Sequence, residues 1–197
     1  MFDTVLVAGL GLMGGSMAKT IKARTLSRVL GWNRTRATAE QALADGSIDA
    51  IATDALFREV DLVIIGLYPQ ATVDWLLENM PKMKKGCVIV DMVGVKQFMV
   101  DHLEQAALDA GVHYVGGHPM AGREFSGLDY ALPTLFDGAS MIFVPTKSSS
   151  ERILSQLEAY FMSLGFGQTV RCTAEQHDHM IAFTSQLAHV VSSAYIK

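Results

Sequence analysis

The sequence predicts an α/β protein built on a doubly wound, mostly parallel sheet. Short β-branched runs alternate with longer segments of helical spacing, a pattern typical of consecutive βαβ units. The right-handed crossovers of such units place helices on both faces of one sheet. Half of the 197 residues are hydrophobic, which is enough apolar material for a large buried core.

The predicted elements follow from apolar runs and from the residues that end them. The run over 61–67 is apolar through its middle, as expected for a strand that is covered on both faces. Asp45-Gly46, Pro81 and Gly111 each end a helical pattern. Strands are predicted at residues 5–8, 28–32, 61–67, 87–90, 113–116 and 140–144, and helices at 13–23, 36–44, 72–80, 97–110 and 151–164.

The last segment differs from the rest of the chain, because residues 174–196 read as one long helix with no strand after it. We therefore expect two domains: an α/β domain over residues 1–172, and over 173–197 the first helix of an all-helical domain. The helical pattern reaches Lys197 without a cap signal, so we expect the helical domain to be truncated.

Composition excludes several classes of function. The formal net charge is −4 and no run of five or more Lys or Arg is present, so we expect no nucleic-acid partner. No apolar stretch approaches the roughly 18 residues of a membrane span, and no basic segment precedes the first strand. We expect a cytoplasmic protein without a membrane partner. The two cysteines form no disulfide framework, and Cys87 is expected in the core.

A glycine-rich run directly after the first predicted strand predicts a Rossmann-like dinucleotide site. Gly9 permits the tight turn, Gly11 lets a pyrophosphate approach the backbone, and Gly14 lets the helix pack on the strand. Leu12 and Met13 begin the helix, whose free N–H groups favour phosphate. A glycine-rich turn without a ligand is the alternative.

The end of the second strand bears on the choice between NAD and NADP. An acidic residue commonly binds the ribose there in NAD-dependent proteins, and this chain has Asn33, Arg34 and Thr35 instead. Asn33 can bind a ribose hydroxyl, and Arg34 and Thr35 can bind a 2′-phosphate. These residues favour NADP, or use of both cofactors, unless Arg34 is only a solvated surface residue.

Two further features are expected beside the cofactor. Ser16 can offer a hydroxyl to the phosphates. Tyr68-Pro69 follows a strand end, so it is expected either as a loop on the nicotinamide-ribose side or as a plain turn.

His118 is the candidate catalytic residue. It follows a predicted strand, so it lies at the edge of the sheet where ligands bind, and Pro119 restrains it. An imidazole can take or give a proton near neutral pH beside a hydride acceptor. From position alone, a surface histidine in a glycine-rich loop is the alternative.

The segment Gly-His-Pro-Met-Ala-Gly at residues 117–122, with Glu124 and Ser126-Gly127 after it, resembles the signature of the prephenate/arogenate dehydrogenase family. Three further parts of the chain are similar to that family in the same order, and the resemblance spans nearly all of the sequence. These are the glycine-rich opening at 9–16, Asp-Met-Val-Gly-Val-Lys at 91–96, and Glu-Gln-His-Asp at 175–178 with Ser-Gln-Leu-Ala-His at 185–189.

The resemblance implies a reaction and roles for several residues. The substrate would be prephenate or arogenate, a hydride would pass to NAD or NADP, and the ring carboxylate would leave as carbon dioxide. His118 matches the histidine that accepts the proton of the ring hydroxyl. His189 matches a substrate-side histidine, and Gln186 stands where the family often has another histidine.

Two departures from the family pattern qualify these roles. Gly94 stands where many members carry a serine whose hydroxyl helps to hold the ring hydroxyl and the nicotinamide, so that bond is absent or is supplied by water. The family's carboxylate-binding arginine, in its later helices, has no counterpart here, and Arg123 is either an anion contact or a solvated loop residue. If only these 197 residues are made, we expect cofactor binding with weak or no turnover, and the family's homodimer only with a complete helical domain.

A metal site is not expected at His177 and His179, because residues two apart on a helix point to nearly opposite sides. His177 and Asp178 are expected to help start the last helix, where an acidic residue suits the positive end.

Two other functions remain open. A β-hydroxyacid dehydrogenase or imine reductase would favour a catalytic lysine or aspartate on the last helix, where residues 176–189 hold no lysine and only Asp178 in the first turn. A non-catalytic dinucleotide-binding module, such as a redox sensor, would not need the His118 motif.

Overall fold

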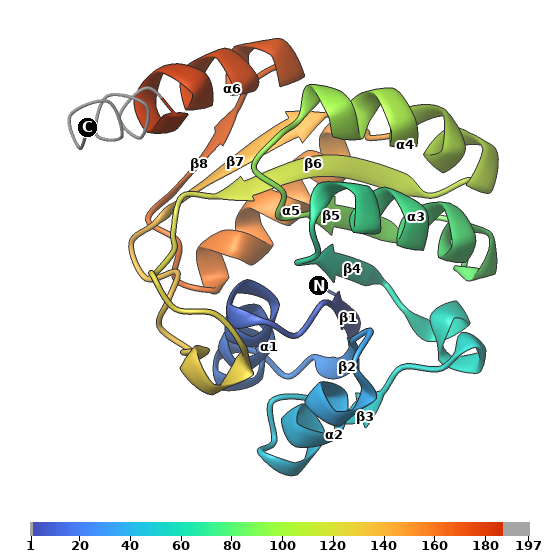
Figure 1. Cartoon of the computed structure of the whole chain (residues 1–197). Coiled ribbons are helices and arrows are strands. Elements are labelled where there is room, and N and C mark those ends of the chain that lie inside the picture. Colours follow the sequence, from blue (N-terminus) through green and yellow to red (C-terminus); the bar gives the residue numbers. More distant parts are fainter. Residues whose placement is uncertain (1, 187–197) are drawn as a thin grey trace.

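The computed structural model describes residues 2–186 and confirms the predicted fold class (Figure 1). The strands are β1 (Thr4–Ala8), β2 (Arg28–Trp32), β3 (Ala50–Ile51), β4 (Leu62–Ile65), β5 (Val88–Asp91), β6 (His113–Pro119), β7 (Ser140–Pro145) and β8 (Gln168–Arg171). The α-helices are α1 (Leu12–Arg24), α2 (Arg36–Ala44), α3 (Pro69–Asn79), α4 (Gln97–Ala110), α5 (Glu151–Ser163) and α6 (Ala174–Ile181). Shorter 3-10 helices are η1 (Asp54–Glu59), η2 (Met80–Lys82) and η3 (Leu128–Tyr130).

The described part of the chain forms one eight-stranded sheet in the order β3-β2-β1-β4-β5-β6-β7-β8. Each pair of neighbours is parallel except β6 and β7, which are antiparallel. The direction of winding reverses between β1 and β4. In an open α/β sheet the ligand crevice lies at such a reversal, outside the carboxyl ends of the strands.

Both faces of the sheet are buried, as the apolar runs predicted. Alternate residues of β1 belong to different cores: Val5 and Val7 pack with α1, α2 and α5, whereas Leu6 and Ala8 pack with α3 and α4. Figure 1 shows these helices as two layers on opposite sides of the strands. Cys87 is fully buried in the second core, which confirms its predicted place, and burial raises the pKa of its thiol to about 12.

Several predicted boundaries were wrong. The edge strands β3 and β8 were not predicted. Helix α3 begins at Pro69 rather than at residue 72, so Tyr68, its N-cap residue, ends the loop after β4 and Pro69 belongs to the helix. The expected long helix is α-helical only over Ala174–Ile181 and continues as a π-helix over Ala182–Gln186; residues 187–197 lie outside the described residues. Among the described residues, no helix is long and apolar enough to cross a membrane.

A buried ion pair holds the carboxyl end of β5. Asp91 and Lys96 both have fully buried side chains, and the Lys96 ammonium donates to the Asp91 carboxylate. The same carboxylate accepts the Val93 N–H at 2.8 Å and the Tyr114 hydroxyl at 2.7 Å. Burial lowers the pKa of Lys96, and the charge of Asp91 opposes that change. The loop between β5 and α4 is therefore fixed from inside the protein.

We expect Lys96→Met to lower the free energy of unfolding by about 3–5 kcal/mol, because it leaves the Asp91 carboxylate buried without a counter-charge. Urea unfolding measures this change. Lys147→Met is the control, because Lys147 makes a solvent-exposed pair with Glu104, and its loss should change stability little. Equal effects of the two substitutions would contradict a structural role for the buried pair.

Candidate functional site

The glycine-rich turn between β1 and α1 lies against the end of β4. Gly9 has a φ of +91°, and a Cβ there would come within 2.7 Å of the Gly66 carbonyl oxygen. A Cβ on Gly14 would lie 1.8 Å from the Gly9 carbonyl oxygen. Only glycine fits at both positions, so the sequence itself sets the close approach of the turn to the helix.

The open side of this turn suits a dinucleotide phosphate. A Cβ on Gly11 would meet no atom within 4 Å, so space lies beside the backbone there. Gly11 is the N-cap of α1 and offers no side-chain cap, and the first turn of the helix, which begins with Leu12 and Met13, has no acidic residue. The N–H groups and the positive end of the helix dipole are thus left for an anion. The residues present fit the pyrophosphate of a nicotinamide dinucleotide.

The residues after β2 hold the turn and border the expected ribose position. Asn33 accepts the Leu10 N–H at 3.0 Å through its side-chain oxygen and donates to the Thr35 carbonyl at 3.1 Å. Its amide therefore braces the glycine-rich turn, a role that the sequence did not reveal. Arg34 and Thr35 are exposed, and none of the ion pairs among residues 2–186 involves Arg34.

Ser16 was wrongly expected to face the phosphates. Its side chain is fully buried, and its hydroxyl oxygen accepts the Leu132 N–H at 3.0 Å, so it fastens the segment after η3 to α1. Tyr68 is 87% exposed at the start of α3, at the carboxyl end of β4.

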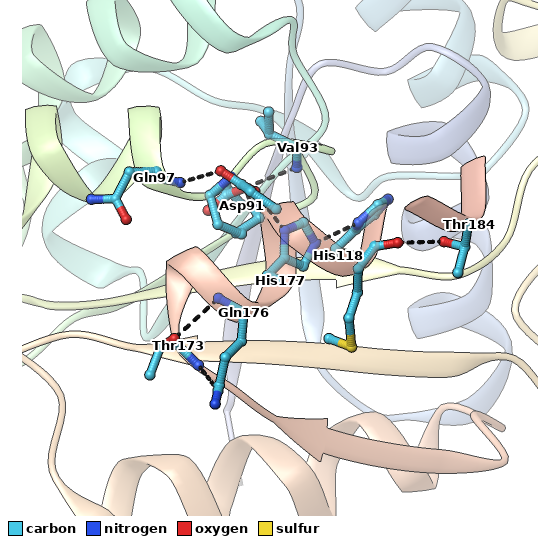
Figure 2. A network of polar contacts seen from close by, with 11 residues as sticks. Asp91, Val93, Gln97, His118, Thr173, Gln176, His177 and Thr184 are labelled. Carbon is cyan, nitrogen blue, oxygen red and sulfur yellow. Dashed lines mark hydrogen bonds and ion pairs between the residues drawn. The ribbon is translucent and has the colours of Figure 1, made fainter. Parts of the chain in front are cut away.

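His118 lies at the carboxyl end of β6 and makes a direct contact with α6. Its Nδ1 is 2.8 Å from Nε2 of His177 (Figure 2). On the other side of the His177 ring, Nδ1 is 2.7 Å from a carboxylate oxygen of Asp178. His177 is fully buried, whereas His118 is partly buried. Two segments that are far apart in the sequence therefore meet at one imidazole pair.

Asp178 caps the start of α4, whereas it was expected to stabilise the start of its own helix, α6. Its two carboxylate oxygens accept the N–H groups of Lys96 at 2.8 Å and Gln97 at 2.9 Å, at the start of α4. The expectation that His177 and Asp178 help start their own helix was wrong. The Thr173–Gln176 capping box begins α6, and Glu175 is the acidic residue of its first turn.

The environment keeps both imidazoles neutral. Burial lowers the pKa of His118 to about 4, and electrostatic repulsion of a second proton beside His177 and the charge of Lys96 add to this effect. Burial also lowers the pKa of His177, although Asp178 opposes the change. Burial acts to raise the pKa of Asp178, but the Gln97 N–H, His177 and the Lys96 N–H together hold it below its ordinary value. The carboxylate is thus ionised beside neutral rings.

Gly94 lies next to the catalytic candidate. A Cβ at Gly94 would be 3.8 Å from Nε2 and 3.7 Å from Cε1 of His118, in ordinary van der Waals contact, so the absent side chain leaves room for about one atom beside the ring. Along the same edge, a Cβ on Gly66 would meet the Met92 side chain at 3.0 Å. The loops that follow β1, β4 and β5 therefore form one continuous border that leads to His118.

The other predicted substrate-binding residues are Arg123, Gln186 and His189. Arg123 is exposed in the loop after β6, with its guanidinium 5.0 Å from the centre of the Phe125 ring. Phe125 in turn stacks on Tyr130 at 4.7 Å. The backbone of Gln186 ends the π-helix, and His189 lies outside the described residues.

Sequence reasoning missed the contact between His118 and His177 and the buried group of Asp91, Lys96 and Tyr114. Because His118 and His177 are 59 positions apart, no local spacing could indicate the contact. His177 and His179 do not converge on a common point, since His177 is buried against His118 and His179 is exposed.

The fold and the glycine-rich turn at the sheet reversal define a Rossmann-type dinucleotide-binding domain. The sequence matches the family described as prephenate dehydrogenase, nucleotide-binding domain, over residues 17–168. The chain belongs to that family.

Individual relatives agree with this assignment. Prephenate dehydrogenase of Bacillus subtilis (strain 168) is 32% identical over 200 residues, which cover 100% of this chain and 53% of the relative. The crystal structure of prephenate dehydrogenase from Aquifex aeolicus, in complex with hydroxyphenyl propionate and NAD+, matches with a TM-score of 0.89 at 26% identity, over 100% of this chain and 68% of that one. Synechocystis arogenate dehydrogenase matches with a TM-score of 0.87 at 27% identity, over 98% of this chain and 68% of that one. The chain spans about half the length of the Bacillus relative.

Because burial lowers the pKa of His118 to about 4, we expect its ring to titrate near pH 4 rather than near 6.5 in an NMR titration. The unfolded chain then binds this proton first as the pH falls. The free energy of unfolding should therefore be fully present above about pH 6.5 and decline as the pH falls toward 4. His118→Asn, which cannot titrate, should flatten part of this dependence. A midpoint at or above 6.5 would contradict the described burial.

Proposed function

We propose that this chain is the dinucleotide-binding and catalytic part of a dehydrogenase that oxidises and decarboxylates prephenate or arogenate in tyrosine biosynthesis. The observation that carries the proposal is the neutral, partly buried imidazole of His118 at the end of β6, on the same sheet edge as the glycine-rich turn. The family match supports the choice of substrate. The names of the relatives include both prephenate and arogenate dehydrogenase, so either ring compound fits.

The chemistry needs a base rather than a charged acid at this position. When bound, the nicotinamide supplies a hydride acceptor. His118 accepts the proton of the ring hydroxyl as the hydride leaves the carbon that bears it, and the ring carboxylate departs as carbon dioxide. The proton returns to the oxygen when the ring becomes aromatic, so no net proton is released. A lowered pKa suits this step, because the ring is already in its accepting form at neutral pH.

The predicted substrate residues keep their roles as proposals. Gly94 leaves room for the ring hydroxyl, or for a water molecule, beside the imidazole. Arg123 can offer a positive charge to a carboxylate from the loop after β6, and for Gln186 and His189 we propose the substrate-side roles that the family resemblance implies. Tyr68 and Pro69 would border the nicotinamide ribose at the start of α3.

The cofactor proposal is NADP, or both NADP and NAD. The loop that carries Arg34 and Thr35 is tied to the glycine-rich turn by Asn33, so both residues stay near the expected ribose. No carboxylate stands at residues 33–35 to repel a 2′-phosphate. Arg34 is exposed and can reach such a phosphate without first breaking an ion pair within the described residues.

Three expectations of wider scope are also proposals. Thr173 begins α6 with a capping box directly after β8, which supports a boundary between residues 172 and 173. We propose a homodimer formed through a complete helical domain. We also propose a cytoplasmic location, for which the unpaired Cys87 and Cys172 suit a reducing compartment.

The reaction is tested by mixing the protein with NAD+ or NADP+ and either prephenate or arogenate, and following the absorbance of the reduced nicotinamide. We expect reduction that depends on one of the two ring compounds. His118→Asn should lower kcat by about 10²–10⁴-fold while cofactor affinity is unchanged, because the general base is lost. His102→Asn, on the exposed face of α4, is the matched control.

The same assay is repeated with the chain fused to the part of the Bacillus subtilis relative that it does not cover. If neither protein reduces the cofactor with either ring compound, the proposed reaction is wrong. If His118→Asn retains full turnover, the assignment of the base is wrong.

The cofactor choice is tested with Arg34→Ala. We expect its affinity for NADP+ to fall by about tenfold or more, since a charge-assisted bond to phosphate contributes about 1.5–3 kcal/mol. Its affinity for NAD+ should be nearly unchanged. Calorimetric titration measures both values, and Arg36→Ala, whose side chain pairs with Glu40, is the control. Equal losses for the two cofactors would contradict a role in binding the 2′-phosphate.

A further inference from the structure

We propose that His177 and Asp178 are positioning residues that hold His118 in one tautomer, with the proton on Nδ1 and a free lone pair on Nε2. The inference rests on the proposed function only in that it takes His118 as the base. Three consecutive hydrogen bonds support it: they join the Lys96 N–H to Asp178, Asp178 to His177, and His177 to Nδ1 of His118.

The direction of the bonds is set at the carboxylate. Asp178 accepts two backbone N–H groups at the start of α4, and an ionised carboxylate has no proton to donate. At 2.7 Å from Asp178, Nδ1 of His177 must therefore be the donor. A neutral imidazole carries one proton, so Nε2 of His177 can only accept.

The acceptor on His177 then decides the state of His118. Nε2 of His177 is 2.8 Å from Nδ1 of His118, so Nδ1 of His118 must donate. Its single proton is used in this bond, and Nε2 is left as an acceptor. The fully buried His177 has no solvent to replace its partners, which makes the reverse order costly.

The free nitrogen lies beside the loop that contains Gly94. A Cβ on Gly94 would make ordinary van der Waals contact with Nε2 of His118 at 3.8 Å and with Cε1 at 3.7 Å, and because glycine carries no Cβ, that position beside the ring is left unfilled. The loop that contains Gly94 ends at Lys96, whose N–H is held by Asp178. The Asp178 carboxylate thus determines the tautomer of His118 through His177 and also holds the end of the loop that lies beside His118.

A purely structural role for these residues makes a different prediction. If His177 only filled space and Asp178 only capped α4, then substitutions would lower stability but leave the tautomer of His118 unchanged. The tautomer is therefore the property to measure.

The experiment is ¹⁵N NMR of the histidine rings in the free protein, with signals assigned by single substitutions. We expect wild-type His118 to carry its proton on Nδ1. His177→Phe keeps a ring in the same place but removes the acceptor, so His118 should shift toward the Nε2–H form. His177→Gln places a carbonyl oxygen where Nε2 stood and should restore the wild-type form. Asp178→Asn is an independent variant, because its amide can donate to His177 and so remove the preference.

Turnover provides the second readout. In the assay with prephenate or arogenate, His177→Phe should lower kcat by about a hundredfold, since the base is no longer presented in its accepting form, and His177→Gln should recover most of the loss. His179→Phe is the matched control, because His179 is exposed two positions further along α6. It should change neither the tautomer nor kcat.

The proposal is overturned if wild-type His118 carries its proton on Nε2, or if His177→Phe and Asp178→Asn both leave its tautomer unchanged. The NMR measurement needs no substrate. If the tautomers behave as expected but neither ring compound is turned over, the positioning role stands and the proposed reaction fails.

Discussion

The ligand edge of this domain depends on the contact between the Asp178 carboxylate and the first N–H groups of α4. A carboxylate at the start of a helix satisfies donors that have no partner within the helix and meets the positive end of the helix dipole. Here the carboxylate belongs to α6, so the same contact attaches α6 to the start of α4. Lys96, whose N–H the carboxylate accepts, also pairs through its buried side chain with Asp91 at the end of β5, so both ends of the loop between β5 and α4 are fixed.

Most of the fold could be predicted from the sequence, because the central strands are apolar on both faces and the helices end at recognisable residues. The errors lie where that signal is absent. Strand β8 is an edge strand with mostly exposed side chains, and β3 has only two residues, so neither forms an apolar run. Pro69 was interpreted as part of a turn, whereas proline is also well suited to the first position of a helix.

The candidate site was predictable residue by residue but not as an arrangement. The glycine-rich turn follows β1 and His118 lies near the end of β6, which extends to Pro119 rather than ending at the predicted residue 116, and the strand context placed both on the correct edge. The partner of His118 could not be found in this way, because strand order and helix packing bring His177 to it. Asn33 is a related case: its amide was expected to face a ribose, and the structure shows that its oxygen already serves the backbone of Leu10.

The reversal of β7 has a consequence for how the site can change. Because β7 runs antiparallel to β6, the chain leaves the sheet after Pro119 and re-enters it at Ser140 on the same edge. The excursion between them rests on α1, where Leu128 lies against Gly15 and the Leu132 N–H binds Ser16. Since α1 also begins at the glycine-rich turn, a change in this excursion would be transmitted to the helix that is proposed to meet the dinucleotide phosphates.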